Sequence, residues 1–286
     1  MSKTTTVACT LRPPFLCTHS TIETVASSNV QFKRAARTMH FRLVLFSVLL
    51  FGWINIALIL LLVNIVLTYF NKRMFARFCA NMTEKYNEIC DSVKEELFKD
   101  LNDHKKDEKI CILEVGAGSG ANFKYYNRNA TVQSIEPNLY FSKYFEENRA
   151  KFPHLDIKEI KKGFGENLSS AGITDESVDV AVMTLVLCSV EDQERCLAEI
   201  KRVLKPGGKF IFLEHIIGDV GSSTRTLQKI LMTGGFWPFL YDNCCVDRQT
   251  DKAIEEAGFS KLELKKIELK KLGPILKPHV MGIATK

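Results

Sequence analysis

The chain has 286 residues, 46% hydrophobic and 25% charged, a size and composition that fit one large α/β domain with an appended segment. The formal net charge of +6 is mild and spread along the chain, so it argues weakly for an anionic membrane surface and hardly at all for a nucleic-acid partner. The nine cysteines lack the spacing of a small disulfide-bonded domain and any paired C-x-x-C zinc pattern, so we expect neither a disulfide scaffold nor a metal site.

Residues 1–38 form a leader that is rich in Thr and Ser, contains two adjacent prolines and shows no helical or strand periodicity. A composition of this kind predicts disorder. Met39 stands directly before a hydrophobic run, so the sequence leaves open whether translation starts at Met1 or at Met39.

Residues 43–70 are 28 consecutive uncharged residues, dense in Leu, Ile and Val. Because about 20 apolar residues span a bilayer, this segment predicts a membrane anchor. A cleaved signal peptide has a shorter apolar region and would not follow so long a leader. Asn55 and Asn64 leave a single span, a hairpin and a tilted insertion open. Lys and Arg residues are equally frequent on both flanks, so the charge bias does not decide the orientation.

Residues 80–286 predict a folded domain. It starts with a helix at 82–101 whose apolar residues share one face, and a polar linker at 102–109 follows. Cys111, Cys188 and Cys196 fall inside predicted core elements, which indicates reduced thiols and a domain that faces the cytosol.

The stretch from Ile110 to Asn122 is a short apolar strand that runs directly into glycines. Gly116, Gly118 and Gly120 let the backbone turn sharply and approach a ligand that a Cβ atom would exclude, at a point where a helix should begin. The pattern predicts a nucleotide-binding turn, and its spacing also satisfies the dinucleotide-binding pattern. A plain glycine-rich strand-to-helix turn is the other alternative.

The acid of this stretch favours S-adenosylmethionine (SAM) over a dinucleotide. A carboxylate at the end of a buried strand costs roughly several kcal/mol unless a cation meets it. The α-ammonium group of SAM would meet it, whereas a pyrophosphate would be repelled. We therefore expect SAM as the cofactor, bound at the turn by Glu114, Gly116, Ala117, Gly118 and Gly120.

Two further loops are candidate parts of the same site. The second strand, 132–135, ends in a carboxylate that could accept both ribose hydroxyls of adenosine, before a helix at 139–150. The loop after a third strand near 155–160 carries a polar pair that could read the adenine edge. A surface turn acid and an ordinary polar loop are the respective alternatives. The residues concerned are Glu136, Pro137 and Asn138 in the first loop and Gly165, Glu166 and Asn167 in the second.

The fourth strand with its exit, 178–190, is apolar without alternation, so we expect it at the centre of the sheet. Leu187 and Cys188 lie at its carboxyl end and should border the transferred methyl group. Cys188 is better interpreted as a small packing residue than as a nucleophile.

The chain after residue 192 predicts an amphipathic helix, 193–204, and a fifth strand, 209–215, which ends in His215 at the ligand edge. His215 is the best-placed candidate for a catalytic base, with a hydrogen-bonded histidine at a strand end as the alternative. An aromatic segment at 222–243 could cover the site or dock on a membrane. The last expected elements are a helix at 248–257 and strands at 262–269 and 280–285.

Several motifs together resemble the class I SAM-dependent methyltransferases. They are Leu-Glu-Val-Gly-Ala-Gly-Ser-Gly-Ala-Asn-Phe-Lys, Glu-Pro-Asn, Ser-Val-Asp-Val, Arg-Val-Leu-Lys-Pro-Gly-Gly and Leu-Glu-His. Thr-Leu-Val-Leu-Cys-Ser-Val followed by Gln-Glu-Arg narrows the resemblance to the membrane-anchored alkyl-thiol S-methyltransferases of the methyltransferase-like group. It covers residues 43–286, with Glu136 where relatives commonly carry Asp.

The resemblance implies an α/β fold with a doubly wound seven-stranded sheet in the order 3-2-1-4-5-7-6, SAM as methyl donor, and residence on the endoplasmic reticulum membrane and lipid droplets, facing the cytosol. We expect in-line transfer of a methyl group to a small lipophilic thiol, with membrane lipid as a further partner. The alternatives are an oxygen or nitrogen acceptor in another small molecule or lipid, a non-catalytic membrane scaffold, and a dehydrogenase, which Glu114 opposes. The substrate and the oligomeric state stay open.

Overall fold

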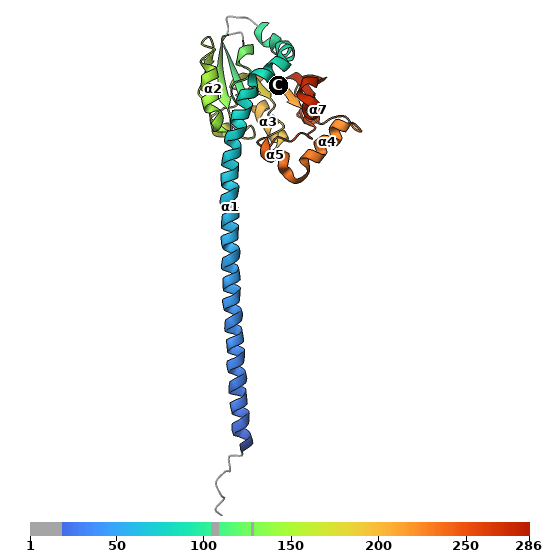
Figure 1. The fold of residues 1–286 in the computed structure, drawn as a ribbon. Coiled ribbons are helices and arrows are strands. Elements are labelled where there is room, and N and C mark those ends of the chain that lie inside the picture. The colour runs from blue at the N-terminus through green and yellow to red at the C-terminus, as the bar shows by residue number, and fades with distance from the viewer. Residues whose placement is uncertain (1–18, 104–108, 127–128) are drawn as a thin grey trace, which may run out of the picture. The chain divides into compact units, whose positions relative to one another are not determined.

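The computed structural model describes residues 19–103, 109–126 and 129–286. The chain divides into two compact units, Met1–Val66 and Leu67–Lys286. Helix α1, His19–Asp103, runs through the first unit and continues into the second (Figure 1).

The apolar part of α1 carries the predicted membrane anchor. All side chains from Thr38 to Phe70 are exposed, and α1 is the one helix of the described chain that is long and apolar enough to cross a membrane, by length and composition. Ser47 Oγ and Asn55 Nδ2 each donate to the carbonyl four residues earlier, at 2.9 and 2.7 Å. Each of these two side chains therefore donates a hydrogen bond within the helix, as a segment in lipid favours.

The structure extends α1 back to His19, whereas composition predicts an irregular leader up to residue 38. Helix formation has a costly nucleus and a cheap propagation, so a long apolar helix can extend into a neighbouring segment that would not nucleate one alone. The remainder of the predicted leader, residues 1–18, lies outside the described residues.

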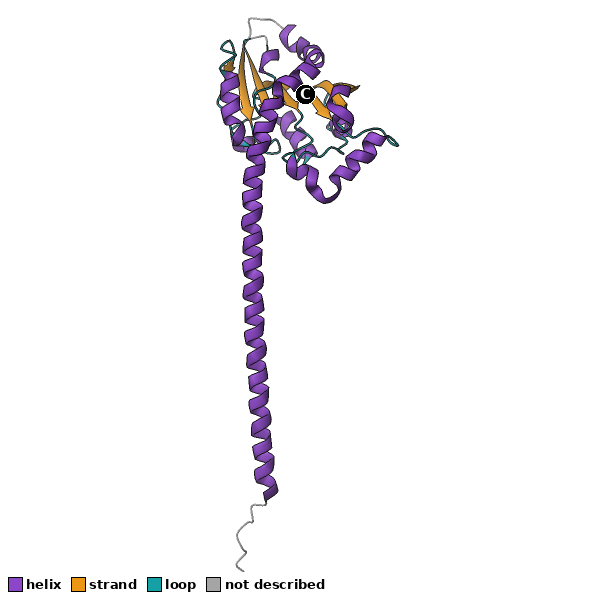
Figure 2. Cartoon of the chain, in the orientation of Figure 1, coloured by secondary structure: helices purple, strands orange, loops and turns teal. Residues whose placement is uncertain are grey.

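The second unit is built on a seven-stranded sheet in the order β3-β2-β1-β4-β5-β7-β6, which confirms the predicted order and fold class. Strands β1 to β5 are parallel, and β7 runs antiparallel to both of its neighbours. The strands, orange in Figure 2, lie between helices. They are β1 Ile110–Val115, β2 Ala130–Ile135, β3 Asp156–Ile157, β4 Val178–Thr184, β5 Leu204–His215, β6 Lys261–Glu268 and β7 Pro278–Thr285.

The central strands are buried on both faces, as their unbroken apolar sequence predicts. In β4, Ala181 and Met183 belong to one hydrophobic core cluster, whereas Val180 and Val182 belong to a second cluster. The second cluster also contains Phe98 and other residues from the last part of α1. The predicted amphipathic helix 82–101 is thus the last part of α1, with its apolar face packed on the sheet.

The connections differ from the predicted ones mainly after β1. The glycine turn leads into a single 3₁₀ turn, η1, and not into the expected helix. Only nine residues separate Gly120 from β2, and Phe123 turns inward into the core, so a helix of several turns has no room. The other helical elements are η2 Leu139–Phe141, α2 Ser142–Arg149, η3 Leu168–Ala171, α3 Gln193–Val203, α4 Ser223–Met232, η4 Thr233–Gly235, α5 Phe236–Leu240, α6 Thr250–Glu256, η5 Lys270–Leu272 and α7 Gly273–Leu276, with η1 at Phe123–Tyr125.

Candidate active site

The three glycines after β1 all have positive φ, at 67°, 52° and 78°, but they are not equivalent. A Cβ on Gly116 would lie 2.4 Å from Val186, and one on Gly120 would lie 2.2 Å from Phe123, so the packing of the protein itself requires both glycines. A Cβ on Gly118 would meet nothing closer than Phe141, at 3.7 Å. Gly118 is therefore the glycine whose missing side chain leaves space.

Glu136 lies directly against this space. Its Oε2 accepts from the Gly118 amide at 3.0 Å and its Oε1 accepts from the Asn138 amide at 2.9 Å. Each carboxylate oxygen offers two lone pairs, so one on each oxygen is left for a further donor. Burial raises the pKa of Glu136 to about 7, although the two amides oppose this shift. The structure thus brings the predicted turn and the predicted ribose carboxylate into contact.

Asn138 joins this loop to two segments that are distant in sequence. Its Nδ2 donates to the Lys72 carbonyl at 3.1 Å and to Asp242 Oδ2 at 2.9 Å, and Lys72 Nζ lies 3.6 Å from Asp242. Asn71 Nδ2 donates to the carbonyl of Phe239. The first turn of α1 in this unit therefore meets α5 and the residues directly after it at the Glu136 loop, which no sequence pattern indicated.

Glu114 has partners within the chain, which corrects the argument that selected SAM. It is 2% exposed, and it accepts from Asn122 Nδ2 at 2.7 Å and from the Tyr126 hydroxyl at 3.0 Å. The required cation is Lys94, fully buried, whose Nζ donates to Asn122 Oδ1 at 2.7 Å and to Asn87 Oδ1 at 2.9 Å. Burial raises the pKa of Glu114 to about 7 and lowers that of Lys94 to about 8. Contact of Glu114 with a ligand ammonium stays a prediction.

The loop after β3 uses its predicted polar side chains internally. Glu166 Oε1 accepts from the Glu191 amide at 2.6 Å, just before α3, and Asn167 Oδ1 caps η3 by accepting from the Ser170 amide at 3.2 Å. A Cβ on Gly165 would lie 2.6 Å from Cys196, so this glycine is also required by packing. These contacts are those of an ordinary polar loop, the alternative that the sequence left open. Recognition of adenine by the side chains of the loop stays a prediction.

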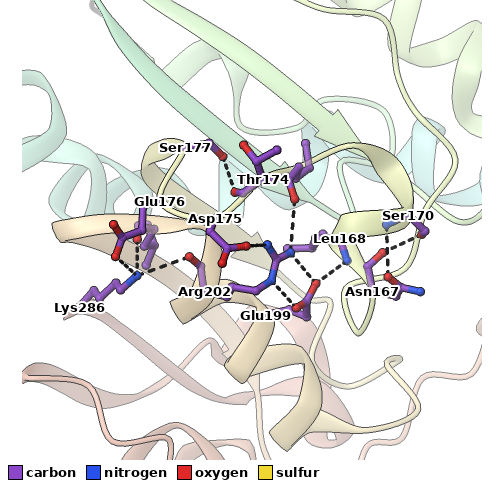
Figure 3. A network of polar contacts seen from close by, with 12 residues as sticks. Asn167, Leu168, Ser170, Thr174, Asp175, Glu176, Ser177, Glu199, Arg202 and Lys286 are labelled. Atoms are coloured by element: carbon purple, nitrogen blue, oxygen red, sulfur yellow. Dashed lines mark hydrogen bonds and ion pairs between the residues drawn. The ribbon is translucent and has the colours of Figure 1, made fainter.

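An ion-pair network fixes the same loop to α3 (Figure 3). Glu199 Oε2 accepts from the Leu168 amide at 2.8 Å, and Arg202 donates to both oxygens of Glu199, at 2.6 and 2.8 Å. Arg202 also pairs with Asp175. The network holds the loop in place without contributing a group to the sheet edge that carries the glycine turn.

The ends of β4 and β5 form the second part of the candidate site. Glu214, fully buried, accepts from the amides of Val186 and Leu187 at 3.0 and 3.1 Å, and so fixes the turn that carries Cys188. His215 is the last residue of β5, and its Nε2 lies 3.2 Å from Cys244 Sγ. The structure therefore brings the predicted Leu187, Cys188 and His215 together.

Cys244 is a site residue that sequence reasoning missed. It follows the aromatic segment, and the backbone places it against strand ends that precede it by more than 25 residues. Its neighbour Cys245 donates its amide to the Cys188 carbonyl at 2.9 Å. The odd cysteine count was the one available signal, but it did not indicate which cysteines meet.

Comparison with known proteins agrees with this geometry. A methyltransferase domain model matches residues 113–212. The human thiol S-methyltransferase TMT1A is 40% identical over 216 residues, which cover 75% of this chain and 87% of the relative. Human thiol S-methyltransferase TMT1B is 35% identical over 221 residues, with the same coverage. The chain belongs to the thiol S-methyltransferase family. The resemblance that the motifs indicated is thereby confirmed.

A solved structure supports the fold of this thiol S-methyltransferase family member. A SAM-dependent methyltransferase from Thermotoga maritima, described as a possible histamine N-methyltransferase, superposes with a TM-score of 0.50 and 22% identity, covering 74% of this chain and 98% of that one. At this identity the likeness shows the fold alone. The family and fold make the chain a SAM-dependent methyltransferase.

The residues at the glycine turn fit a SAM molecule. Gly118 leaves a space that a Cβ would fill, and Glu136 beside it keeps unused lone pairs in a buried position. Unpartnered acceptor capacity of a buried carboxylate suits the two hydroxyls of a ribose. When bound, SAM supplies an electrophilic methyl group on a sulphonium.

Proposed function

We propose that this methyltransferase transfers the methyl group of SAM to the sulphur of a small lipophilic thiol. The observation that carries the proposal is the 40% identity to a human thiol S-methyltransferase over 87% of that relative. In the reaction, the thiol sulphur forms a bond to the methyl carbon as the bond between that carbon and the sulphonium breaks, and the thiol proton leaves to a base or to water. Alignment of donor and acceptor supplies most of the rate enhancement in such a displacement.

The two halves of the candidate site divide the work. Glu136 accepts the ribose hydroxyls, the backbone of the glycine turn and of the loop at 163–167 lies along the nucleoside, and Asn138 fixes the Glu136 loop. The turn at Leu187 and Cys188, held by Glu214, borders the methyl group and the acceptor. His215 lies at the same edge, where it takes the thiol proton or holds the acceptor.

The apolar segment at 43–70 anchors the enzyme in a membrane, for which we propose the endoplasmic reticulum and lipid droplets, with the catalytic unit on the cytosolic side. The supports are its 28 uncharged residues and the exposure of its side chains in the described helix. A membrane concentrates lipophilic thiols in the bilayer, so an anchored enzyme meets them at a higher local concentration.

The test is an acceptor panel. Full-length protein in detergent is incubated with methyl-labelled SAM and with an alkyl thiol, the matching alcohol, the matching amine and a phenol, and products are identified by mass spectrometry. We expect a methyl thioether from the thiol at a rate at least tenfold above every other acceptor. Preferential methylation of oxygen or nitrogen would refute the thiol assignment. SAM binding without any product would instead favour the scaffold alternative.

A further inference from the structure

Two thiols and an imidazole meet at the ends of β4 and β5. Their potential ligand atoms all lie within 4.8 Å of one another, and the residues are Cys188, His215 and Cys244. Among the residues that the structure describes, this is the one group of three or more His, Cys, Asp or Glu side chains with ligand atoms so close. Cys188 and His215 are each 2% exposed, and Cys244 is partly buried. The cluster therefore lies inside the protein and is not a chance gathering on its surface.

The spacing suits a tetrahedral thiophilic cation. Zinc lies about 2.3 Å from cysteine sulphur and about 2.0 Å from histidine nitrogen, which places two such ligands about 3.6 to 3.8 Å apart at a tetrahedral angle. His215 Nε2 and Cys244 Sγ are 3.2 Å apart, and no pair in the cluster exceeds 4.8 Å. The separation that one ion requires lies between these two values. Two cysteines and one histidine leave the fourth position open, which is the arrangement of catalytic zinc sites.

The ligand atoms have few other uses within the protein. Outside the cluster, Cys188 Sγ makes long contacts, 3.6 Å to the Leu185 carbonyl and 3.5 Å to Ser189 Oγ. His215 Nδ1 is buried without a hydrogen-bond partner in the described part of the chain. Buried polar atoms of this kind are costly unless a ligand or a water meets them. Nδ1 is not the nitrogen that lies 3.2 Å from Cys244 Sγ, so Nε2 is the imidazole atom of the cluster.

The backbone around the cluster is fixed by hydrogen bonds that leave the ligand atoms free. Glu214 holds the amides of Val186 and Leu187, and the Cys245 amide donates to the Cys188 carbonyl at 2.9 Å. The second bond ties the segment carrying Cys244 to the turn carrying Cys188. Groups held by their supporting shell in this way are preorganised for a ligand.

We propose that Cys188, His215 and Cys244 bind Zn²⁺ and that the acceptor thiol takes the fourth position as its thiolate. The cation site stands on the geometry, and its role in thiol binding rests on the proposed function. Binding of the thiol forms a sulphur–zinc bond and releases the thiol proton to water. The sulphur then forms its bond to the methyl carbon while the carbon–sulphonium bond breaks, and the neutral thioether, a weaker ligand than a thiolate, leaves the metal.

Charge explains what the metal contributes. Zn²⁺ with two thiolates and a neutral imidazole carries no net charge, so its burial is not opposed as an isolated cation would be. A free thiol with a pKa of about 8.5 is only a few per cent thiolate at neutral pH, whereas a metal-bound thiol is deprotonated outright. The ion thus replaces the base that His215 would otherwise supply. Spacing along the sequence did not reveal the site because its ligands come from three separate elements.

The site is tested first by metal binding alone. Full-length protein in detergent is stripped with a chelator, kept reduced, and titrated with Co²⁺, which reports tetrahedral thiolate ligation by its visible and charge-transfer absorption. We expect one equivalent to bind with this spectrum and Zn²⁺ to displace it. Cys244→Ser should weaken Co²⁺ binding at least tenfold, and His215→Gln should do the same. Cys245→Ser, the adjacent cysteine outside the cluster, is the matched control and should bind as the unaltered protein does.

The role in catalysis is tested by adding an alkyl thiol to the cobalt protein without SAM, which should shift the charge-transfer band. Stripped protein should lose at least tenfold in thiol methylation and recover it with one equivalent of Zn²⁺. Absence of cobalt binding, or a disulfide between Cys188 and Cys244 in place of metal, would overturn the site. Full activity of stripped protein would overturn the thiolate role and return His215 to a base. Metal binding with no thiol methylation under any condition would instead refute the proposed function and leave the cation site standing.

Discussion

Gly118→Ala separates ligand space from backbone strain at the glycine turn. Gly118 has a φ of 52°, and a Cβ there would meet no atom of the protein closer than 3.7 Å. The left-handed backbone costs a residue with a Cβ about 1–2 kcal/mol, and for a unit of this size each kcal/mol lowers the Tm by roughly 2–4 °C. The expected fall in Tm is therefore about 2–8 °C, with the fold retained.

A matched control isolates the strain. Gly207, in the first part of β5, has a φ of 75° and nothing within 4 Å of its Cβ position. Gly207→Ala should lower the Tm by a similar amount. Gly116→Ala is not a usable substitute, because its Cβ would lie 2.4 Å from Val186 and the variant would be damaged by packing.

The assay is calorimetric titration of SAM into full-length protein in detergent, with thermal unfolding of the same samples. The Gly118 amide touches the carboxylate proposed to hold the ribose, so a Cβ at this position intrudes on the ligand. We expect Gly118→Ala to weaken SAM binding at least tenfold, which corresponds to about 1.4 kcal/mol, and Gly207→Ala to leave it unchanged. Equal SAM affinity in the two folded variants would refute the assignment of the glycine turn as the cofactor site.

Three further predictions follow from the described contacts. Burial raises the pKa of Glu114 and of Glu136 from 4.5 to about 7, so each contributes about 3 kcal/mol of stability below pH 4.5 that is lost as pH rises through 7. Ligand-free protein should therefore have a lower Tm at pH 8 than at pH 5.5, and the Tm of Glu136→Gln should change less between these two pH values. An equal change of Tm in the two proteins would contradict this. Arg202→Ala should destabilise the protein by about 1–3 kcal/mol through loss of its bonds to Glu199 and Asp175, without changing SAM affinity. Lys143→Ala, which removes an exposed ion pair with Glu147, should change neither the stability nor the SAM affinity. An Arg202→Ala protein of unaltered Tm would show that the network is dispensable. Protein from a eukaryotic cell should resist carbonate extraction and show no endoglycosidase-sensitive band shift, and a shift mapped to any exposed sequon asparagine would place the unit in the lumen; the sequons begin at Asn81, Asn129 and Asn167.

The sheet and the glycine turn could be predicted because their patterns are local. An apolar strand followed by glycines and a carboxylate at the end of the next strand mark the carboxyl edge of a parallel sheet, and the Gly118 amide donates to the Glu136 carboxylate there. The helix expected after the turn does not form, since Asn122 and Phe123 turn their side chains inward. Asn122 turns inward because it donates to Glu114, and Phe123 because it packs in the core. Helical periodicity in the sequence predicts neither contact.

Lys94 and Glu166 show why the rest was not predictable. A lysine on an amphipathic helix is ordinarily interpreted as solvent-facing, yet Lys94 stands four residues after Cys90 and three before Leu97, on the buried face. From the sequence, the Glu166 carboxylate could equally contact a ligand or accept from backbone amides. In the structure it accepts from the Glu191 amide just before α3. The contact of Cys244 with His215 depends on the path of the long connection between β5 and α6, which no local sequence pattern records.

The hydrogen bond from Asn138 to the Lys72 carbonyl bears on where the enzyme can be divided. Lys72 lies only two residues beyond Phe70, the last residue of the apolar segment, and no flexible linker separates them within α1. A truncated protein starting at residue 80, where the sequence pattern places the domain, would lose Lys72, its pair with Asp242 and the Asn71 contact to Phe239 in α5. Trimming for solubility therefore has to stop at Leu67, where the second unit begins, so that Asn71 and Lys72 keep their contacts.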